Sequence, residues 1–122
     1  MDRFEIAQSQ AKLADKPILL IFSGSDWCSW CIRLDREVFS QPEFKSWADQ
    51  HVITFIADFP RNSTQSPEER ARNQALLEKY GVEGYPTVLL LNADGSVIAR
   101  TGYKPGGAAN YVAMLERMLP TK

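Results

Sequence analysis

The stretch Trp27-Cys28-Ser29-Trp30-Cys31 contains both cysteines of the chain, with two residues between them. It follows a continuous apolar run at 18–22 and a polar turn at 23–26, and the residues after it keep a helical pattern to about 39. The apolar run is typical of a strand buried on both faces of a parallel sheet. A disulfide between such near neighbours closes a very small loop and adds little stability. The sequence therefore predicts that this cysteine pair has a reactive role and not a structural one.

The position of Cys28 at the start of a predicted helix has a chemical consequence. The first turn of a helix leaves backbone N–H groups unpaired, and the helix dipole adds partial positive charge. Both effects stabilise a thiolate, so we expect the pKa of the Cys28 thiol to lie below that of a free cysteine. Cys31 lies one turn further on, within disulfide reach, and should be the more buried. Cys28 is the predicted attacking thiol and Cys31 its resolving partner.

Metal binding is the main alternative interpretation of this pair. A structural zinc site needs four ligands, whereas this chain offers two thiols and one histidine, His51. Zinc or copper shared across a dimer, or an inert pair of core cysteines, would also account for the two residues. We predict neither a bound metal nor a cofactor, and we expect His51 to be a surface residue.

The rest of the chain alternates predicted helices and strands. Apolar residues at helical spacing predict helices at 3–14 and 28–39, and a closing helix whose apolar stripe runs from Tyr111 to Leu119. A short helix is predicted from Pro42, and another opens with Ser66-Pro67-Glu68-Glu69. Strands are predicted at 18–22 and 52–57, and a hairpin at 87–91 and 97–101. This order predicts one α/β domain over 1–122, with a mixed central β-sheet sandwiched between helices. The first two strands should be parallel because a helix crosses between them.

Composition excludes several functional classes. Hydrophobic residues make up 44% and charged residues 24% of the 122 residues, and the formal net charge is -1. Lysines and arginines are scattered, so nothing predicts a nucleic-acid or membrane surface. The apolar runs are too short for a transmembrane segment. Asp2, Arg3 and Glu5 interrupt any apolar stretch at the start, so we expect either a cytoplasmic protein or an exported one whose signal peptide has been removed.

A second motif, Gly84-Tyr85-Pro86-Thr87, stands directly before the predicted hairpin. Proline cannot donate a ladder hydrogen bond, so Pro86 fits only the beginning of that strand. A cis peptide bond before Pro86 would place the backbone of Tyr85 beside the cysteines, and we predict that bond.

These two motifs together resemble the thioredoxin superfamily, and the resemblance extends over essentially the whole chain. Three segments resemble more closely its bacterial exported subgroup, the periplasmic Dsb-type reductases of the DsbH kind. The segments are Phe22-Ser23-Gly24-Ser25-Asp26-Trp27-Cys28, Asp58-Phe59-Pro60 and Gly102-Tyr103-Lys104-Pro105-Gly106-Gly107.

The resemblance implies a thioredoxin-like fold in which Pro86 is the cis-proline and Tyr85 offers its backbone to a substrate strand. It also implies that Trp27 and Trp30 form an apolar rim around the reactive sulfur. The implied activity is thiol–disulfide exchange on protein or peptide disulfides, as a reductase in the periplasm or another exported compartment, recharged by an upstream electron-donor oxidoreductase. An oxidase or isomerase, a cytosolic thioredoxin substitute, and a metal-handling module that binds through Cys28 and Cys31 remain the alternatives.

Two departures from cytosolic thioredoxin follow from the same resemblance. Phe22 and Thr54 stand where thioredoxin has a buried carboxylate and its lysine partner, so the usual proton acceptor for Cys31 is missing. Water, a more distant carboxylate such as Asp26, or the leaving thiolate must take that proton. Ser29-Trp30 replaces Gly-Pro between the cysteines, so the redox potential of thioredoxin cannot be transferred to this chain.

Overall fold

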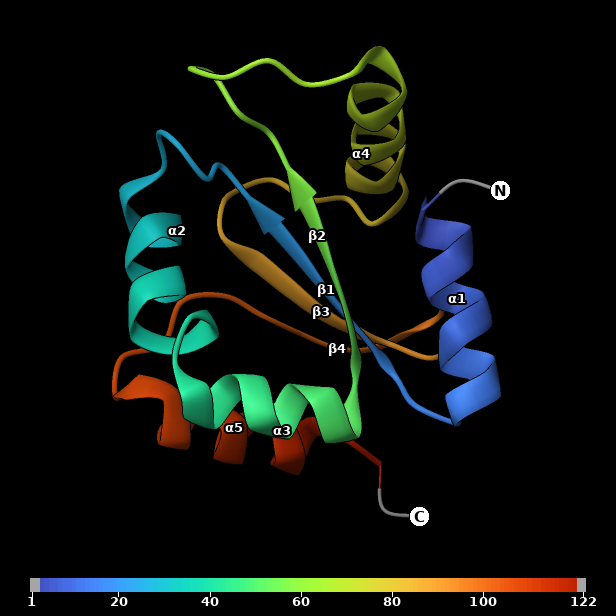
Figure 1. Cartoon of the computed structure of the whole chain (residues 1–122), viewed down its shortest axis with the longest axis vertical. Helices are drawn as coiled ribbons and strands as arrows, with labels where there is room; N and C mark the ends of the chain where they lie inside the picture. Colours follow the sequence, from blue (N-terminus) through green and yellow to red (C-terminus); the bar gives the residue numbers. More distant parts are fainter. Residues whose placement is uncertain (1–2, 121–122) are drawn as a thin grey trace.

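The computed structural model describes residues 3–120 and has a four-stranded sheet at its centre (Figure 1). The ends of the predicted domain, including Asp2, lie outside the described residues. The strand order is β2-β1-β3-β4. The strands are β1 Ile18–Ser23, β2 Ile53–Asp58, β3 Thr87–Leu91 and β4 Val97–Thr101.

The strand directions confirm the predicted mixed sheet. β1 and β2 are parallel and in register from Ile18 opposite Ile53 to Ser23 opposite Asp58. β1 and β3 are antiparallel, as are β3 and β4. β1 and β3 form the middle of the sheet and are almost completely buried, which explains their continuous apolar sequences.

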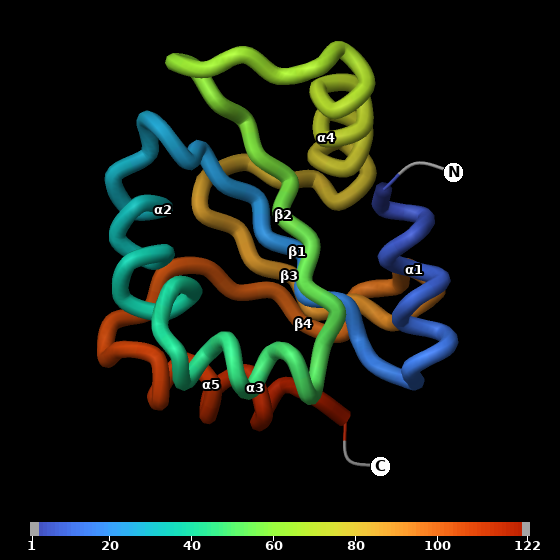
Figure 2. The backbone as a smooth tube through the Cα atoms, in the orientation of Figure 1, coloured from blue at the N-terminus to red at the C-terminus, as the bar shows by residue number. Residues whose placement is uncertain are grey.

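Helices cover both faces of the sheet, as Figures 1 and 2 show. Two apolar clusters fill the layers, and successive residues of β1 alternate between them: Leu19 and Ile21 in one, Ile18, Leu20 and Phe22 in the other. α1 and α4 contribute to the second cluster, and the remaining helices to the first. The helices are α1 Arg3–Ala14, α2 Ser29–Leu34, the π-helical η1 Asp35–Phe39, α3 Pro42–His51, α4 Pro67–Lys79 and α5 Gly107–Met118.

The sequence signals mark most helix ends correctly. Ser66 Oγ accepts a hydrogen bond from the Glu69 N–H (3.1 Å), so it caps α4 as predicted. The helical stretch predicted at 28–39 is confirmed to within one residue, because Cys28 is the N-cap of α2 and η1 ends at Phe39. Its last turn is π-helical, which the sequence did not predict. β2 begins one residue later than predicted, because the Val52 N–H still donates to the carbonyl of Ala48 and ends α3.

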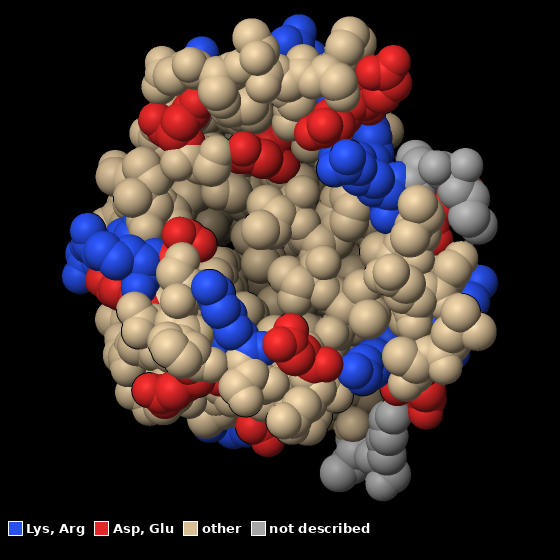
Figure 3. All heavy atoms as spheres, viewed as in Figure 1, with Lys and Arg blue, Asp and Glu red and all other residues tan. Residues whose placement is uncertain are grey.

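The surface carries charges of both signs. In the view of Figure 3, lysines and arginines alternate with aspartates and glutamates, and neither sign forms a continuous patch. None of the helices described is long and apolar enough to cross a bilayer.

Candidate active site

Cys28 and Cys31 form a disulfide between the end of β1 and the first turn of α2, with their Cα atoms 5.2 Å apart. Cys28 is the N-cap residue of α2, and its Sγ accepts a hydrogen bond from the Cys31 N–H at 3.3 Å. Cys28 exposes 8% of its surface and Cys31 exposes 4%, which is the predicted order. The helix therefore directs a backbone donor at the sulfur of Cys28, where it would favour a thiolate.

Gly24 holds the turn that leads into the pair. Its carbonyl accepts hydrogen bonds from the N–H groups of Trp27 and Cys28 at 3.2 and 2.8 Å. Its N–H lies 3.5 Å from Cys31 Sγ. A Cβ atom at position 24 would lie 2.4 Å from the Trp27 indole, so the close approach of this ring requires glycine.

Trp27 is half-buried and held on several sides. Its Nε1 donates to the carbonyl of Phe59 at 2.6 Å, and its ring packs edge-on against Tyr85 at 5.5 Å. The guanidinium of Arg61 lies over the indole, 3.6 Å from a ring centroid. Through these contacts, Trp27 connects the cysteine turn to the 59–66 loop. Only part of its ring is open to solvent.

Trp30 lies on the outside, with 53% of its surface exposed. It packs on Tyr103 with 5.0 Å between ring centroids, and the Arg33 guanidinium lies 5.5 Å from both rings. Glu37 accepts hydrogen bonds from the Tyr103 hydroxyl (2.5 Å) and from Arg33 Nε (2.6 Å). The Tyr103 hydrogen bond, followed by that of Arg33, lowers the pKa of Glu37, so this carboxylate stays charged and keeps the Tyr103 ring against Trp30.

The Tyr85–Pro86 peptide bond is cis. Pro86 lines a hollow of about 210 Å³ together with Cys31, Ser23 and Ile21. The structure therefore brings the 84–87 motif to the cysteines from a distant part of the sequence. Of the predicted site residues, Trp27 contacts Tyr85 and Pro86 shares the hollow with Cys31, whereas Trp30 lies on the outer side with Tyr103.

Asp35 lies at the candidate site and is not among the residues predicted from the sequence. It lines the same hollow as Cys31, one helical turn further along, and its Oδ2 accepts a hydrogen bond from Ser40 Oγ (2.9 Å). The signal was present in the sequence, because residues four apart lie on the same face of a helix. In β1, the residues that line the hollow are Ile21 and Ser23, and Phe22 lies in the second cluster.

Asp26, the carboxylate suggested by the sequence as a proton acceptor, has another role. Its oxygens accept hydrogen bonds from the N–H groups of Arg61 and Asn62, both at 2.9 Å, and from Ser63 Oγ at 3.3 Å. The hydrogen bond from the Arg61 backbone is the main cause of its lowered pKa. Asp26 therefore binds the 59–66 loop as a carboxylate and is a poor acceptor of a proton.

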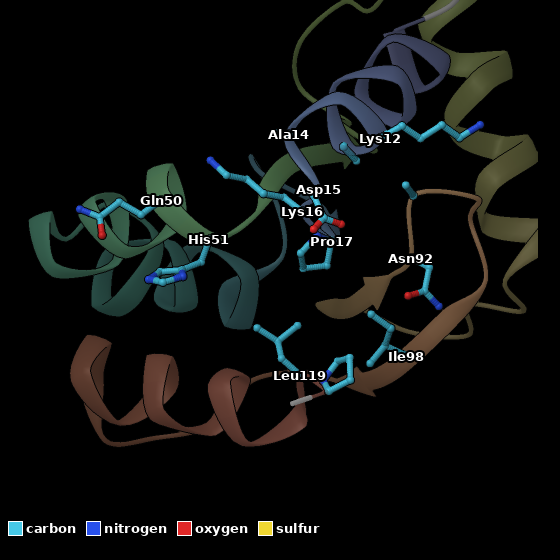
Figure 4. A pocket seen from close by; sticks show the side chains of 13 residues that line it. Lys12, Ala14, Asp15, Lys16, Pro17, Gln50, His51, Asn92, Ile98 and Leu119 are labelled. Carbon is cyan, nitrogen blue, oxygen red and sulfur yellow. The ribbon is translucent and has the colours of Figure 1, made fainter. Parts of the chain in front are cut away.

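A second cavity lies at the opposite end of the sheet (Figure 4). It has a volume of about 710 Å³ and is lined by the end of α1 and the segment that leads into β1, by the turn after β3, and by the last residue of α3, His51. His51 is exposed and its ring packs on Trp47, with the centroids 5.5 Å apart. Neither cysteine reaches this cavity, so it does not belong to the candidate active site.

Within 3–120, no cluster of three or more histidine, cysteine, aspartate or glutamate side chains is arranged to hold a metal ion. The reactive groups that the structure brings together at this site are the sulfur atoms of Cys28 and Cys31.

A family model described as a thioredoxin-like domain matches residues 4–119. The chain belongs to the thioredoxin-like family. Within this family, it is 40% identical over 113 residues to the disulfide bond reductase DsbH of Chlamydia pneumoniae, covering 93% of this chain and 68% of that protein. The solved structure of a DsbH oxidoreductase superimposes with a TM-score of 0.88 at 39% identity, covering 92% of this chain and 78% of that one.

The chain is also similar to the thiol:disulfide interchange protein DsbD of Cronobacter sakazakii. It is 34% identical to this chain over 98 residues, which are 80% of this chain and 15% of DsbD. The chain therefore corresponds to a small part of that longer protein.

Proposed function

We propose that this protein is a thiol–disulfide oxidoreductase that reduces protein or peptide disulfides. The observation that carries the proposal is the Cys31 N–H directed at Cys28 Sγ, at the first turn of a helix and beside a cis-proline. A backbone donor in this position stabilises the attacking thiolate. The similarity to the disulfide bond reductase DsbH supports the direction of the reaction.

The reaction begins from the dithiol form. The Cys28 thiolate attacks one sulfur of the substrate disulfide, and the other substrate sulfur leaves as a thiolate that takes a proton. The Cys31 thiol then loses its proton and attacks Cys28 Sγ, which releases the second substrate sulfur as a thiol. The substrate gains two electrons and two protons, and the protein is left with the Cys28–Cys31 disulfide. An upstream dithiol oxidoreductase must return it to the dithiol form.

Substrate recognition uses the surface around Cys28. Tyr85 precedes the cis-proline at the start of β3, and its backbone would pair with an extended substrate segment. The exposed Trp30 offers an apolar surface on the other side. Trp27 contributes mainly by holding the turn that carries Cys28.

We place this activity in the periplasm or another exported compartment. The support is the resemblance of the 22–28, 58–60 and 102–107 segments to exported Dsb-type reductases, together with the similarity to DsbH and DsbD. Fractionation of cells that produce the full-length protein tests this placement, and recovery with the cytoplasmic markers would contradict it.

The activity is tested by reduction of insulin with dithiothreitol as the electron donor. The wild type should accelerate the reduction, Cys28→Ser should abolish the acceleration, and Cys31→Ser should accumulate a mixed disulfide with a single-cysteine peptide. The equilibrium of the Cys28–Cys31 pair with glutathione then gives its potential. A potential as oxidising as that of dedicated oxidases, about −120 mV, would favour the oxidase alternative.

A further inference from the structure

Arg61 has a fixed position at the edge of the active site. Its backbone N–H donates to Asp26 Oδ1 at 2.9 Å, and its guanidinium lies over the Trp27 indole at 3.6 Å. Trp27 itself is held by the hydrogen bond from Nε1 to the carbonyl of Phe59. Both the backbone and the side chain of Arg61 are thus oriented before any substrate arrives, which lowers the entropic cost of using it.

The guanidinium of Arg61 has no carboxylate partner within 3–120. The ion pair within 4.0 Å in this part of the chain is Arg33 with Glu37. The nearby Asp26 carboxylate accepts N–H groups of the backbone and the Ser63 hydroxyl. Stacking on an aromatic ring uses the face of a guanidinium and leaves its N–H groups free at the edge. Arg61 therefore presents an exposed, unpaired set of donors.

The surface proposed to bind the substrate lies next to the Arg61 guanidinium. Trp27 directly precedes Cys28, and its ring contacts Tyr85, whose backbone would pair with the substrate. Burial raises the pKa of the Tyr85 hydroxyl, and the positive charge of Arg61 partly opposes that rise, so the guanidinium acts electrostatically on this residue. On the other side of the site, the Arg33 guanidinium is paired with Glu37. The two guanidinium groups therefore differ in that Arg33 has a carboxylate partner, whereas Arg61 has none among the described residues.

We infer that Arg61 is a specificity-determining residue that binds an acidic side chain of the substrate next to the disulfide to be reduced. The planar guanidinium matches a carboxylate in geometry and can bind it through two parallel N–H···O bonds. The preferred substrates have a glutamate or aspartate on the Trp27 side of the reacting cysteine and an apolar residue toward Trp30. This inference rests on the proposed function, because it concerns the substrate of the same site.

The test uses two disulfide-bonded peptides that are identical except for Glu or Gln beside the cysteine, with kcat/KM measured under a saturating electron donor. The wild type should reduce the Glu peptide about three- to five-fold faster, as expected for one exposed ion pair, and the preference should shrink at high salt. Arg61→Gln should bring the ratio close to one, and Arg61→Lys should keep part of it. Arg117→Gln, the same charge change near the end of α5, should leave the ratio unchanged.

The outcomes separate three explanations. If Arg61 only braces Trp27, Arg61→Gln slows both peptides equally and the ratio persists, which overturns the inference. Equal rates for both peptides with the wild type also overturn it and leave the proposed function intact. Failure of the wild type to reduce either peptide overturns the proposed function, and the inference with it.

Discussion

Cys31 needs a proton acceptor when it resolves the mixed disulfide, and its neighbours limit the choice. Position 22 holds a phenylalanine, and Asp26 is committed to the 59–66 loop. Asp35 lies one turn along the helix and lines the same hollow as Cys31. A carboxylate at the mouth of a hollow can take the proton directly or through one water molecule.

Asp35→Asn should therefore slow resolution. The variant keeps an oxygen that can accept the Ser40 hydrogen bond, so the helix should be preserved. We expect about a tenfold slower release of a thiol leaving group from Cys28 near neutral pH, less than the full effect of a general base because water can substitute. Stopped-flow release with wild type and variant measures this rate. Equal rates at every pH would show that Asp35 takes no part in the proton transfer.

The two thiols should differ in reactivity after reduction. Cys28 accepts an N–H at the helix start and is the more exposed, so its thiolate should form at lower pH. Limiting iodoacetamide near neutral pH should label Cys28 at least about tenfold faster than Cys31. Peptide mapping of the labelled protein gives the ratio, and faster labelling of Cys31 would reverse the assignment.

Gly24→Ala should destabilise the protein. The added methyl group would overlap the Trp27 indole, which is held by Phe59, Arg61 and Tyr85 and has little room to move. Overpacking of this kind costs about 1–3 kcal/mol in the free energy of unfolding. Gly84→Ala is the matched control, since no atom lies within 4 Å of its added Cβ. Urea unfolding should separate the two variants, and equal losses would contradict the argument.

The turn before α2 and the loop after β2 act as one unit. Asp26 joins them through Arg61, Asn62 and Ser63, and Asp58 accepts hydrogen bonds from the backbone N–H and hydroxyl of Ser25 at 3.0 and 2.6 Å. The cysteine pair is thus attached both to the end of β1 and to the loop that leads to α4. We expect this double attachment to hold the position of Cys28 when its disulfide is reduced.

Stability should depend on pH through Asp26. Because its pKa is lowered in the folded state, the carboxylate stabilises the fold fully above its unfolded pKa, near 3.8, and this contribution disappears as pH falls through the lower folded value. The difference in free energy of unfolding between wild type and Asp26→Asn should be constant above about pH 5 and decrease toward pH 2. Other carboxylates, such as Glu37, titrate in both proteins and cancel. A difference that does not change with pH would contradict this role.

The active site lies at the end of β1, a central strand of the sheet. β1 lies between β2 and β3, with an apolar cluster on each face, and the cysteines follow its last residues. β2 is an edge strand, and its second and fourth residues, Thr54 and Ile56, are exposed. The loss in free energy of unfolding on substitution should therefore depend on how buried each strand residue is, more than on its residue type.

Ile21 and Ile56 provide a matched test because they are paired in register on adjacent strands. Ile21 is 3% exposed and Ile56 is 54% exposed. Ile21→Ala should lower the free energy of unfolding by about 2–5 kcal/mol, whereas Ile56→Ala should cost less than about 1 kcal/mol. Denaturant unfolding of both variants gives these values. Similar losses would mean that β2 is covered in solution.

Much of the fold was predictable because its signals are local. The apolar runs of β1 and β3, the Ser66 cap and the hairpin at 87–101 depend on neighbouring residues, and the structure confirms them. The shift of β2 by one residue was not predictable, because the carbonyl of Ala48 decides where α3 ends. The π-helical turn at 35–39 likewise has no local signature in the sequence.

The chemistry of this protein is encoded locally, because two thiols at a helix start and a proline before a strand are short patterns with specific chemical consequences. The surroundings of these groups depend instead on how the chain packs. This packing separates the roles of the two tryptophans, with Trp27 under Arg61 and Trp30 against Tyr103. It also holds the Asp26 carboxylate against the 59–66 loop and places Asp35 at the hollow that Cys31 lines. These contacts join residues far apart in the chain, or depend on which face a helix presents, and so they are set by the packing of the whole sheet and its helices.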